Sequence, residues 1–190
     1  MTPPRLIVLA GPNGAGKSTF FEAHLEALGL DFVNADRLAA LGIDTREAAA
    51  AADALRMAFV AERKSFITET VFSDPAGAKL QFLRDAMAAG YRVTLLFVGL
   101  ASPTLSEARV AQRVRHGGHD VPSDRLARRY AQSLANLVVA LTFVSEAFVF
   151  DNSSAEAPYR LVLSARSGTL RKETARVPQW LSSALPPLKP

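Results

Sequence analysis

The sequence contains no cysteine, which excludes disulfide bonds and metal sites built on thiolates. It also lacks an apolar run near the ~18–20 residues that a membrane-spanning helix needs, so we expect no association with a membrane. Residues 1–5 lead directly into a strand-like segment and leave no room for a signal peptide. We therefore expect a cytoplasmic protein that forms one domain over residues 1–190.

The charge is not balanced, because a net charge of +4 and a pI near 9.8 indicate an anionic partner. Six arginines fall in one short stretch without an intervening lysine: Arg109, Arg113, Arg115, Arg125, Arg128 and Arg129. The planar guanidinium suits bidentate binding of phosphate, whereas a solvated basic face usually mixes lysine with arginine. We therefore expect a small phosphorylated ligand rather than a nucleic acid.

One segment matches the phosphate-binding pattern G-x-x-x-x-G-K-[ST] at every required position. It consists of Gly11, Pro12, Asn13, Gly14, Ala15, Gly16, Lys17 and Ser18, and Thr19 follows it. Its glycines permit a tight turn whose N–H groups point at phosphate oxygens, and the N-terminus of the next helix adds partial positive charge. Lys17 would reach the β- and γ-phosphates, and the Ser18 hydroxyl would bind Mg²⁺. The segment therefore predicts a binding loop for ATP with Mg²⁺.

Strand-like and helical segments alternate along the chain. We expect strands at 5–10, 31–34, 65–70, 91–99 and 146–151, helices at 19–28, 45–64, 75–89, 103–116 and 123–143, and a terminal strand pair at 159–164 and 170–177. Thr45 is expected to cap its helix, with Leu55, Phe59 and Val60 on the buried face. This order predicts an α/β, P-loop NTPase/kinase-like fold of three layers. A mostly parallel five-stranded sheet would be covered on both faces, with a helical lid and a small C-terminal β pair.

The spelling of the phosphate loop is also common among ABC-transporter ATPases. That class needs in addition an L-S-G-G-Q-type helix start and an apolar strand that ends in Asp-Glu, and neither occurs in this sequence. A compact domain with this loop instead favours a kinase that acts on a small molecule. Such an enzyme needs a group that activates the acceptor hydroxyl, a pocket for the acceptor, and positive charge around the transferring phosphoryl group.

Two carboxylates are placed to serve the acceptor. Asp36 follows the second expected strand by two residues and could accept the proton of the acceptor hydroxyl, although it could equally cap the helical turn that includes Arg37. Glu69 ends the third expected strand beside Thr70, where it could bind substrate hydroxyls or Mg²⁺-bound water, or form an ion pair at the strand edge. We expect four residues to bind the acceptor: Asp36, Arg37, Glu69 and Thr70.

The arginine-rich stretch is the source of positive charge. Arg109 and Arg113 are four residues apart and share a helix face, and Arg128 and Arg129 lie on the next expected helix. Two helices joined by a glycine-containing turn would form a lid that brings arginine onto the γ-phosphate. The other basic residues of the stretch are expected on solvated helix faces or in the turn: Arg115, Arg125 and His119.

These features together resemble the zeta-toxin family, in its short bacterial branch, from Leu6 to about Ser153. The segments that carry the resemblance are Gly-Pro-Asn-Gly-Ala-Gly-Lys-Ser-Thr at 11–19, Asn-Ala-Asp at 34–36, Phe-Ile-Thr-Glu-Thr at 66–70, Arg-Val-Arg-His-Gly-Gly-His-Asp-Val-Pro at 113–122 and Asp-Asn-Ser at 151–153. Each segment is common by itself, and their combination is what is typical of the family.

Zeta toxins use ATP to phosphorylate a sugar hydroxyl of UDP-N-acetylglucosamine. The resemblance implies that Asp36 is the base and Lys17 the loop lysine, with Glu69 as an acid on the substrate side. It also implies that Arg113 and either Arg128 or Arg129 hold the γ-phosphate; of these we assign Arg113 and Arg129 to catalysis. An antitoxin protein is an implied partner.

The sequence departs from the larger zeta toxins in two ways. Asn34 stands where they often carry another acid, and little chain follows the fifth expected strand to build an extended pocket for a sugar nucleotide. Other acceptors therefore stay open, namely a nucleoside, a polynucleotide end or an antibiotic. A further alternative is a non-catalytic module that binds ATP, in which Asp36 would be dispensable.

Overall fold

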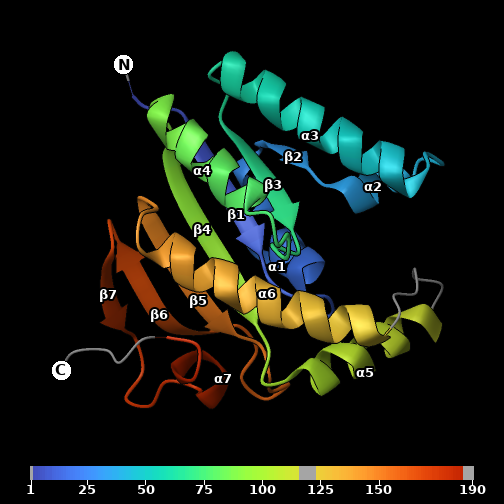
Figure 1. Cartoon of the computed structure of the whole chain (residues 1–190), viewed down its shortest axis with the longest axis vertical. Coiled ribbons are helices and arrows are strands. Elements are labelled where there is room, and N and C mark those ends of the chain that lie inside the picture. Colours follow the sequence, from blue (N-terminus) through green and yellow to red (C-terminus); the bar gives the residue numbers. More distant parts are fainter. Residues whose placement is uncertain (1, 116–122, 186–190) are drawn as a thin grey trace.

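The computed structural model describes residues 2–115 and 123–185, which are built around one seven-stranded sheet (Figure 1). The strands are β1 Arg5–Ala10, β2 Asp31–Val33, β3 Phe66–Thr70, β4 Arg92–Gly99, β5 Glu146–Asp151, β6 Arg160–Arg166 and β7 Thr169–Lys172. Their order across the sheet is β2-β3-β1-β4-β5-β6-β7, with β1 to β5 parallel and β6 and β7 antiparallel. The expected turn at 117–122, with His119, and the residues from 186 onwards lie outside the described residues.

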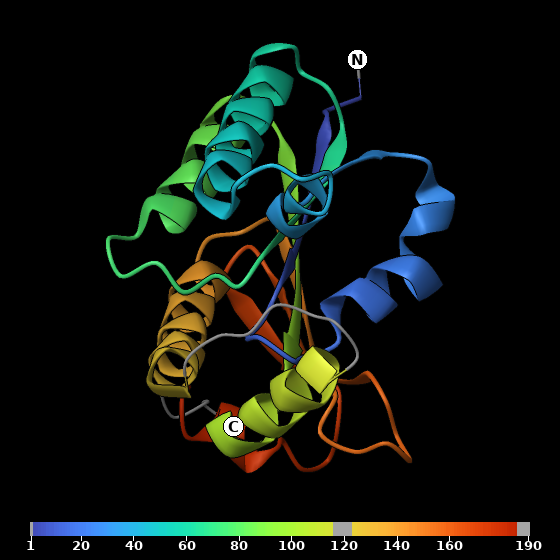
Figure 2. The same ribbon diagram turned by 90° about the vertical axis from the view of Figure 1, so that its right-hand side faces the viewer.

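Helices cover both faces of this sheet. They are α1 Lys17–His24, α2 Ala35–Ala39, α3 Thr45–Ala61, α4 Ala78–Ala88, α5 Pro103–Arg115, α6 Ser123–Leu141 and α7 Gln179–Ser182, with a 3₁₀ turn at Glu26–Leu28. With the sheet seen edge-on, α1 lies on one side and α3, α4 and α6 lie on the other (Figure 2). The expected three-layer α/β, P-loop kinase-like fold is therefore confirmed. Among the described residues, no helix is long and apolar enough to cross a membrane.

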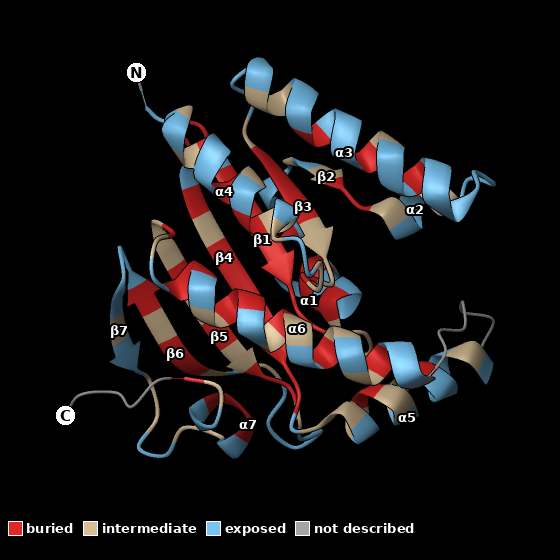
Figure 3. Cartoon of the chain, in the orientation of Figure 1, coloured by how far each residue is buried: buried red, intermediate tan, exposed pale blue. Residues whose placement is uncertain are grey.

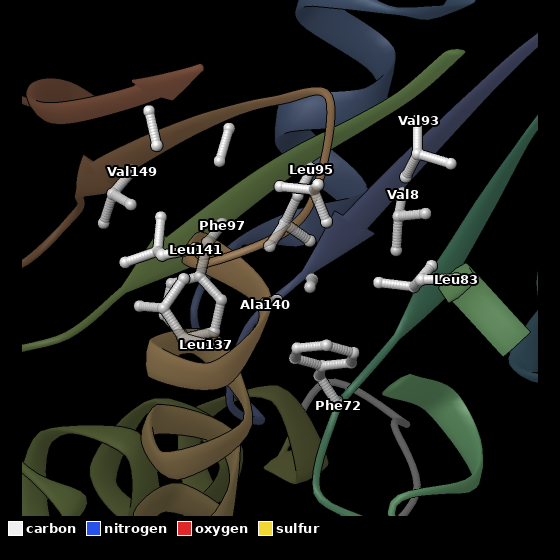
Figure 4. Packing of buried hydrophobic residues seen from close by; sticks show 14 of the residues in the cluster. Val8, Phe72, Leu83, Val93, Leu95, Phe97, Leu137, Ala140, Leu141 and Val149 are labelled. Atoms are coloured by element: carbon white, nitrogen blue, oxygen red, sulfur yellow. The ribbon is translucent and has the colours of Figure 1, made fainter. Parts of the chain in front are cut away.

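Alternation along β1 divides the core between the two faces. Leu6 and Val8 belong to a cluster on the side of α4 and α6, whereas Ile7 and Leu9 pack with residues of α1. The central strands are buried along most of their length, and the outer helix faces are exposed (Figure 3). Figure 4 shows the larger cluster, in which Phe72 lies beside α6 on the side toward Leu83 of α4. Packing on both faces holds the carboxyl ends of β1 and β3 in fixed register, with Leu9 opposite Glu69.

The C-terminal strand pair differs from the expectation in one respect. It extends the main sheet, because β6 pairs antiparallel with β5, so the sheet has seven strands rather than five. This pairing satisfies backbone N–H and C=O groups that would otherwise be unpaired at the edge of β5. The second strand of the pair is also shorter than expected and ends at Lys172.

Helix α3 corrects two smaller expectations. Its cap is Asp44 rather than Thr45, since the Asp44 carboxylate accepts hydrogen bonds from the backbone N–H groups of Arg46 and Glu47. Its buried residues are Ala48, Ala52 and Arg56, whereas Leu55 is 38% exposed. Phe59 and Val60 are partly buried and pack against the core as expected, so the expectation is wrong for Leu55 alone.

Candidate active site

The phosphate loop connects β1 to α1 in a shape that excludes side chains at its glycines. A Cβ added to Gly11, which has φ +144°, would lie 2.1 Å from the carbonyl oxygen of Val98 in β4. Gly16 has φ +90° and directly precedes α1; a Cβ there would lie 2.8 Å from both Asn152 Nδ2 and Tyr159 OH. The loop therefore has the backbone that cradles phosphate, with the N-terminus of α1 beneath it.

Three side chains from outside the loop hold its carbonyl groups. Ser106 Oγ of α5 donates a hydrogen bond to Asn13 O at 2.6 Å, Asn152 Nδ2 donates to Ala15 O at 2.9 Å, and Tyr159 OH donates to Gly16 O at 2.9 Å. Asn152 has a signal in the sequence, because it belongs to the Asp-Asn-Ser segment at 151–153. Nothing in the sequence indicates the contacts of Ser106 and Tyr159, which come from segments about 90 and 140 residues away.

Lys17 lies at the base of the loop and is buried. Its Nζ donates hydrogen bonds to Gly11 O at 3.0 Å and Pro12 O at 3.2 Å, and lies 3.7 Å from Glu69 Oε1. Burial lowers the pKa of Lys17 and raises the pKa of Glu69, while their mutual attraction opposes both shifts. Glu69 is thus directed at the loop lysine from the neighbouring strand, at the carboxyl edge where we expected it.

Asn34 connects the helix turn of Asp36 to the pair formed by Lys17 and Glu69. Its Oδ1 accepts hydrogen bonds from the backbone N–H groups of Asp36 at 2.7 Å and Arg37 at 3.2 Å, and its Nδ2 donates to Glu69 Oε2 at 2.9 Å. Asn34 is therefore the cap of α2, and the alternative that Asp36 caps this turn is wrong. The carboxylate of Asp36 is exposed and borders the cleft described next.

A cleft of about 850 Å³ opens beside the loop. Its lining includes the expected residues Asn13, Ser18, Asp36, Glu69, Thr70, Arg113 and Arg129. Arg113 comes from α5 and Arg129 from α6, and these two helices pack against each other. The cleft thus brings together a phosphate loop, two carboxylates and arginines from the expected lid.

The structure places the remaining expected residues differently. Arg128 points away from the cleft lining, is 75% exposed and pairs with Asp124 one helical turn earlier. Arg125, which we expected on a solvated face, is exposed and borders the cleft. The guanidinium of Arg37 lies 4.9 Å and 4.8 Å from the ring centroids of Phe21 and Phe32, outside the cleft lining.

A charged wall on α3 and α4 was not expected from the sequence. Arg56 Nε donates a hydrogen bond to Thr68 Oγ1 at 2.7 Å, and Arg56 Nη1 donates to Asp53 Oδ1. Lys79 Nζ donates to the same oxygen of Asp53 at 2.7 Å. Arg56, Asp53 and Lys79 all line the same cleft as Arg113 and Arg129.

The residues around the loop suit a nucleoside triphosphate with Mg²⁺. The described residues hold no cluster of three or more histidine, cysteine or acidic side chains that could bind a metal alone. Mg²⁺ usually retains several waters and is bound by one or two protein groups together with substrate phosphates. Ser18, exposed at the cleft directly after Lys17, is placed to be such a group, and Glu69 lines the same cleft.

Comparisons with solved structures place this fold among known proteins. A chain of the complex of AvrRxo1-ORF1 with AvrRxo1-ORF2 superposes with a TM-score of 0.71 and 16% identity, covering 90% of this chain and 61% of that one. A chain of the PezAT chromosomal toxin–antitoxin system of Streptococcus pneumoniae gives a TM-score of 0.61 and 15% identity, with coverage of 80% and 68%. A sugar kinase from Janibacter sp. HTCC2649 superposes with a TM-score of 0.50 and 24% identity, covering 78% of this chain and 86% of that one.

The chain spans about three fifths of the length of the first of these proteins, and at such identities the likeness concerns the fold. No curated protein matches the chain significantly. A protein-family model, described as an AAA domain, matches residues 6–139, which include the phosphate loop, both carboxylates, α5 and most of α6. The chain therefore belongs to the AAA domain family and has a P-loop kinase-like α/β fold.

Proposed function

We propose that this protein is an ATP-dependent kinase of zeta-toxin type, which transfers the γ-phosphoryl group to a hydroxyl of a small acceptor. The observation that carries the proposal is the chain of contacts from Lys17 through Glu69 and Asn34 to the helix turn of Asp36, beside a cleft also lined by Arg113 and Arg129. Donor-binding groups, a base and phosphoryl-binding arginines then share one solvent-accessible space, as a kinase requires.

Each residue has a role in the proposed reaction. Asp36 takes the proton of the acceptor hydroxyl as its oxygen bonds to the γ-phosphorus, and the bond from that phosphorus to the β,γ-bridging oxygen breaks to release ADP. Lys17 and the N–H groups of the loop hold the β- and γ-phosphates, and Arg113 and Arg129 stabilise the charge of the transferring group. Mg²⁺ at Ser18 would supply further positive charge to the phosphate oxygens.

Two features of solved relatives support the donor and partner proposals. The AvrRxo1-ORF1 complex with ORF2 has been solved with ATP, and a chain of that complex covers 90% of this chain. The AvrRxo1 structure is a complex of two proteins, ORF1 and ORF2. The PezAT structure belongs to a system that is named as a toxin with its antitoxin. We therefore propose ATP as the donor and an antitoxin protein as a partner.

The proposed acceptor is a sugar nucleotide such as UDP-N-acetylglucosamine. A cleft of about 850 Å³ lies at the upper part of the range of ~300–1,000 Å³ that is typical of small-molecule sites, so it has room for more than a hydroxyl-bearing ring. A second candidate is transfer to another small acceptor, because Asn34 replaces the additional acid of larger zeta toxins. Arg37 would act on the acceptor side only indirectly, through the position of the α2 turn.

The test is incubation with ATP, Mg²⁺ and a panel of acceptors that includes UDP-N-acetylglucosamine, a neutral sugar, a nucleoside, a polynucleotide 5′ end and an aminoglycoside. Mass spectrometry identifies the product that gains a phosphate. Asp36→Asn should lower kcat for the preferred acceptor by about 10²–10⁴-fold while ATP still binds. Asp85→Asn, on an exposed part of α4, is the matched control and should retain full activity. ATP binding without transfer to any acceptor would instead support a non-catalytic module.

A further inference from the structure

The cleft face of α3 carries a stripe of small residues followed by charged ones. Thr45, Ala49, Asp53 and Arg56 follow one another at intervals of four, four and three residues, which places them on one side of the helix. The first two leave space beside α2, and the last two bring charge to the cleft. Lys79 from α4 completes this wall. None of these residues takes part in the proposed transfer step.

Arg56 is unusually buried for a charged residue, at 6% exposure. Its Nε and Nη1 donate to Thr68 and Asp53, and the guanidinium has further N–H groups beyond these two bonds. Burial removes the hydration of the Arg56 guanidinium, and this free-energy cost must be offset by hydrogen bonds and ion pairs. The carboxylate of Asp53 is itself largely exposed and offsets only part of that cost. Because Arg56 lines the cleft, a ligand there can bind its remaining donors.

Lys79 and Arg56 compete for one carboxylate. Both donate to the same Oδ1 atom of Asp53, so these three side chains together carry a net charge of +1; the carboxylate of Asp74, which accepts from the backbone N–H of Lys79, also lines the cleft. The side chain of Lys79 is 28% exposed, which leaves its ammonium group accessible from the cleft. Two cations thus share one carboxylate at the border of an open cleft, where an anionic group of a ligand can bind both of them.

The wall lies close to the proposed transfer site. Thr68, which accepts from Arg56, directly precedes Glu69, which faces Lys17. Asp36, Glu69, Arg56 and Lys79 all line the same cleft of about 850 Å³. A molecule whose hydroxyl lies beside Asp36 and Glu69 can thus present another group to Arg56 and Lys79 within that cleft.

We propose that Arg56 and Lys79 form a subsite for an anionic group, a phosphate or a carboxylate, of the acceptor molecule. The inference rests on the proposed function and specifies its substrate class: the kinase selects acceptors that carry negative charge near the reacting hydroxyl. Arg56 supplies directional donors, Lys79 supplies a mobile point charge, and Asp53 positions both. Neutral sugars and nucleosides lack the group that this wall binds.

The experiment compares acceptors that differ in charge: glucose with glucose 1-phosphate, glucose with gluconate, and N-acetylglucosamine with UDP-N-acetylglucosamine. The charged member should be preferred by about tenfold or more in kcat/KM, since hydrogen bonds to charged groups contribute that much. The phosphate and carboxylate arms identify which anion the subsite prefers. Equal use of the neutral and charged members would overturn the inference and leave the proposed kinase function intact.

Substitutions of Lys79 and Arg56 test whether these two residues cause the preference for charged acceptors. Lys79→Gln, at a partly exposed position that should tolerate substitution, should raise KM for the charged acceptor about tenfold while KM for ATP and for the neutral acceptor stays unchanged. Arg56→Lys keeps the charge of the buried residue and should weaken binding through loss of the planar donors. Lys172→Gln removes one positive charge from exposed β7 and is the matched control, with no change expected.

A binding measurement separates this inference from failure of the proposed function. With a non-hydrolysable ATP analogue filling the donor site, calorimetry with inorganic pyrophosphate and with citrate reports the subsite even if no acceptor is phosphorylated. Wild-type protein should bind one of these anions about tenfold more tightly than Lys79→Gln. Equal affinity of the wild type, Lys79→Gln and Arg56→Lys for both anions would overturn the inference.

Discussion

The side-chain amide of Asn34 connects the helix turn of Asp36 to the carboxylate of Glu69. Its Oδ1 accepts from the backbone N–H of Asp36 at 2.7 Å, and its Nδ2 donates to Glu69 Oε2 at 2.9 Å, while the other carboxylate oxygen of Glu69 lies 3.7 Å from Lys17. A carboxylate at this position could cap the turn but could not donate to Glu69. One neutral side chain thus sets the proposed base relative to the loop lysine.

Asn34→Ala should therefore cost both stability and activity. Loss of the cap alone should lower the free energy of unfolding by about 0.5–2 kcal/mol, as measured by urea denaturation. The proposed transfer should also slow, by about tenfold or more in kcat/KM, because Glu69 loses a charge-assisted hydrogen bond. Asp44→Ala removes the equivalent cap of α3 and is the control, with a similar stability loss and no loss of activity. Equal activity of the two variants would contradict the role of Asn34.

Arg128 and Arg129 provide a matched pair on α6. Arg129 lines the cleft, whereas Arg128 pairs with Asp124 on the exposed side. We expect Arg129→Gln to lower kcat by about 10³-fold, the lower end of the effect of arginines that bind a transferring phosphoryl group. Arg128→Gln should stay close to wild type in steady-state kinetics and in stability, because exposed ion pairs contribute about 0–1 kcal/mol. A larger loss in Arg128→Gln than in Arg129→Gln would reverse the assignment.

Tyr159 should affect the donor site through the backbone of the phosphate loop. Its OH donates to Gly16 O, so Tyr159→Phe should weaken ATP binding by about 2–10-fold, the usual contribution of one hydrogen bond. Tyr91→Phe is the control, because the OH of Tyr91 donates to Phe59 O and Lys64 O, away from the loop. Calorimetric titration with ATP measures both. A loss of affinity shared equally by the two variants would indicate general destabilisation instead.

The donor side could be predicted because its determinants are local. Residues 11–19 contain the glycines, the lysine and the hydroxyl that the loop requires, and the flanking strand and helix follow directly in the sequence. The choice between Arg128 and Arg129 could not be predicted from the sequence, because adjacent residues of a helix point about 100° apart. The rotation of α6 against the sheet decides which of them borders the cleft, and tertiary packing sets that rotation.

The charged wall was not predictable for a related reason. Asp53, Arg56 and Lys79 read in the sequence as ordinary charges on alanine-rich or mixed helices. They meet in the folded chain, where Arg56 of α3 reaches Thr68 of β3 and Lys79 of α4 reaches Asp53. The sequence left open whether Asp36 caps the turn of α2, because Asn34 and Asp36 both suit a helix start and only the backbone conformation separates them.

The buried phenol of Tyr130 should make the free energy of unfolding depend on pH in alkaline solution. Its OH donates to Leu100 O at 2.7 Å, and burial, with a smaller contribution from Asp151, raises its pKa to about 12. A group whose pKa is raised by folding stabilises the folded state fully below its unfolded pKa near 10, and this contribution is lost as the pH rises towards 12. At pH 8, Tyr130→Phe should therefore be less stable than wild type by about 0.5–1.5 kcal/mol, the contribution of one hydrogen bond.

The difference between wild type and Tyr130→Phe should then narrow as the pH is raised from 9 to 11, because only the wild type carries this buried phenol. Urea unfolding at closely spaced pH values measures the difference directly, and it cancels the titration of lysines, which both proteins share. The absorbance of tyrosinate at about 295 nm gives an independent check, since it should appear at higher pH in native protein than in protein unfolded by urea. A stability difference that stays constant over this range would mean that the phenol of Tyr130 titrates as it does in the unfolded chain.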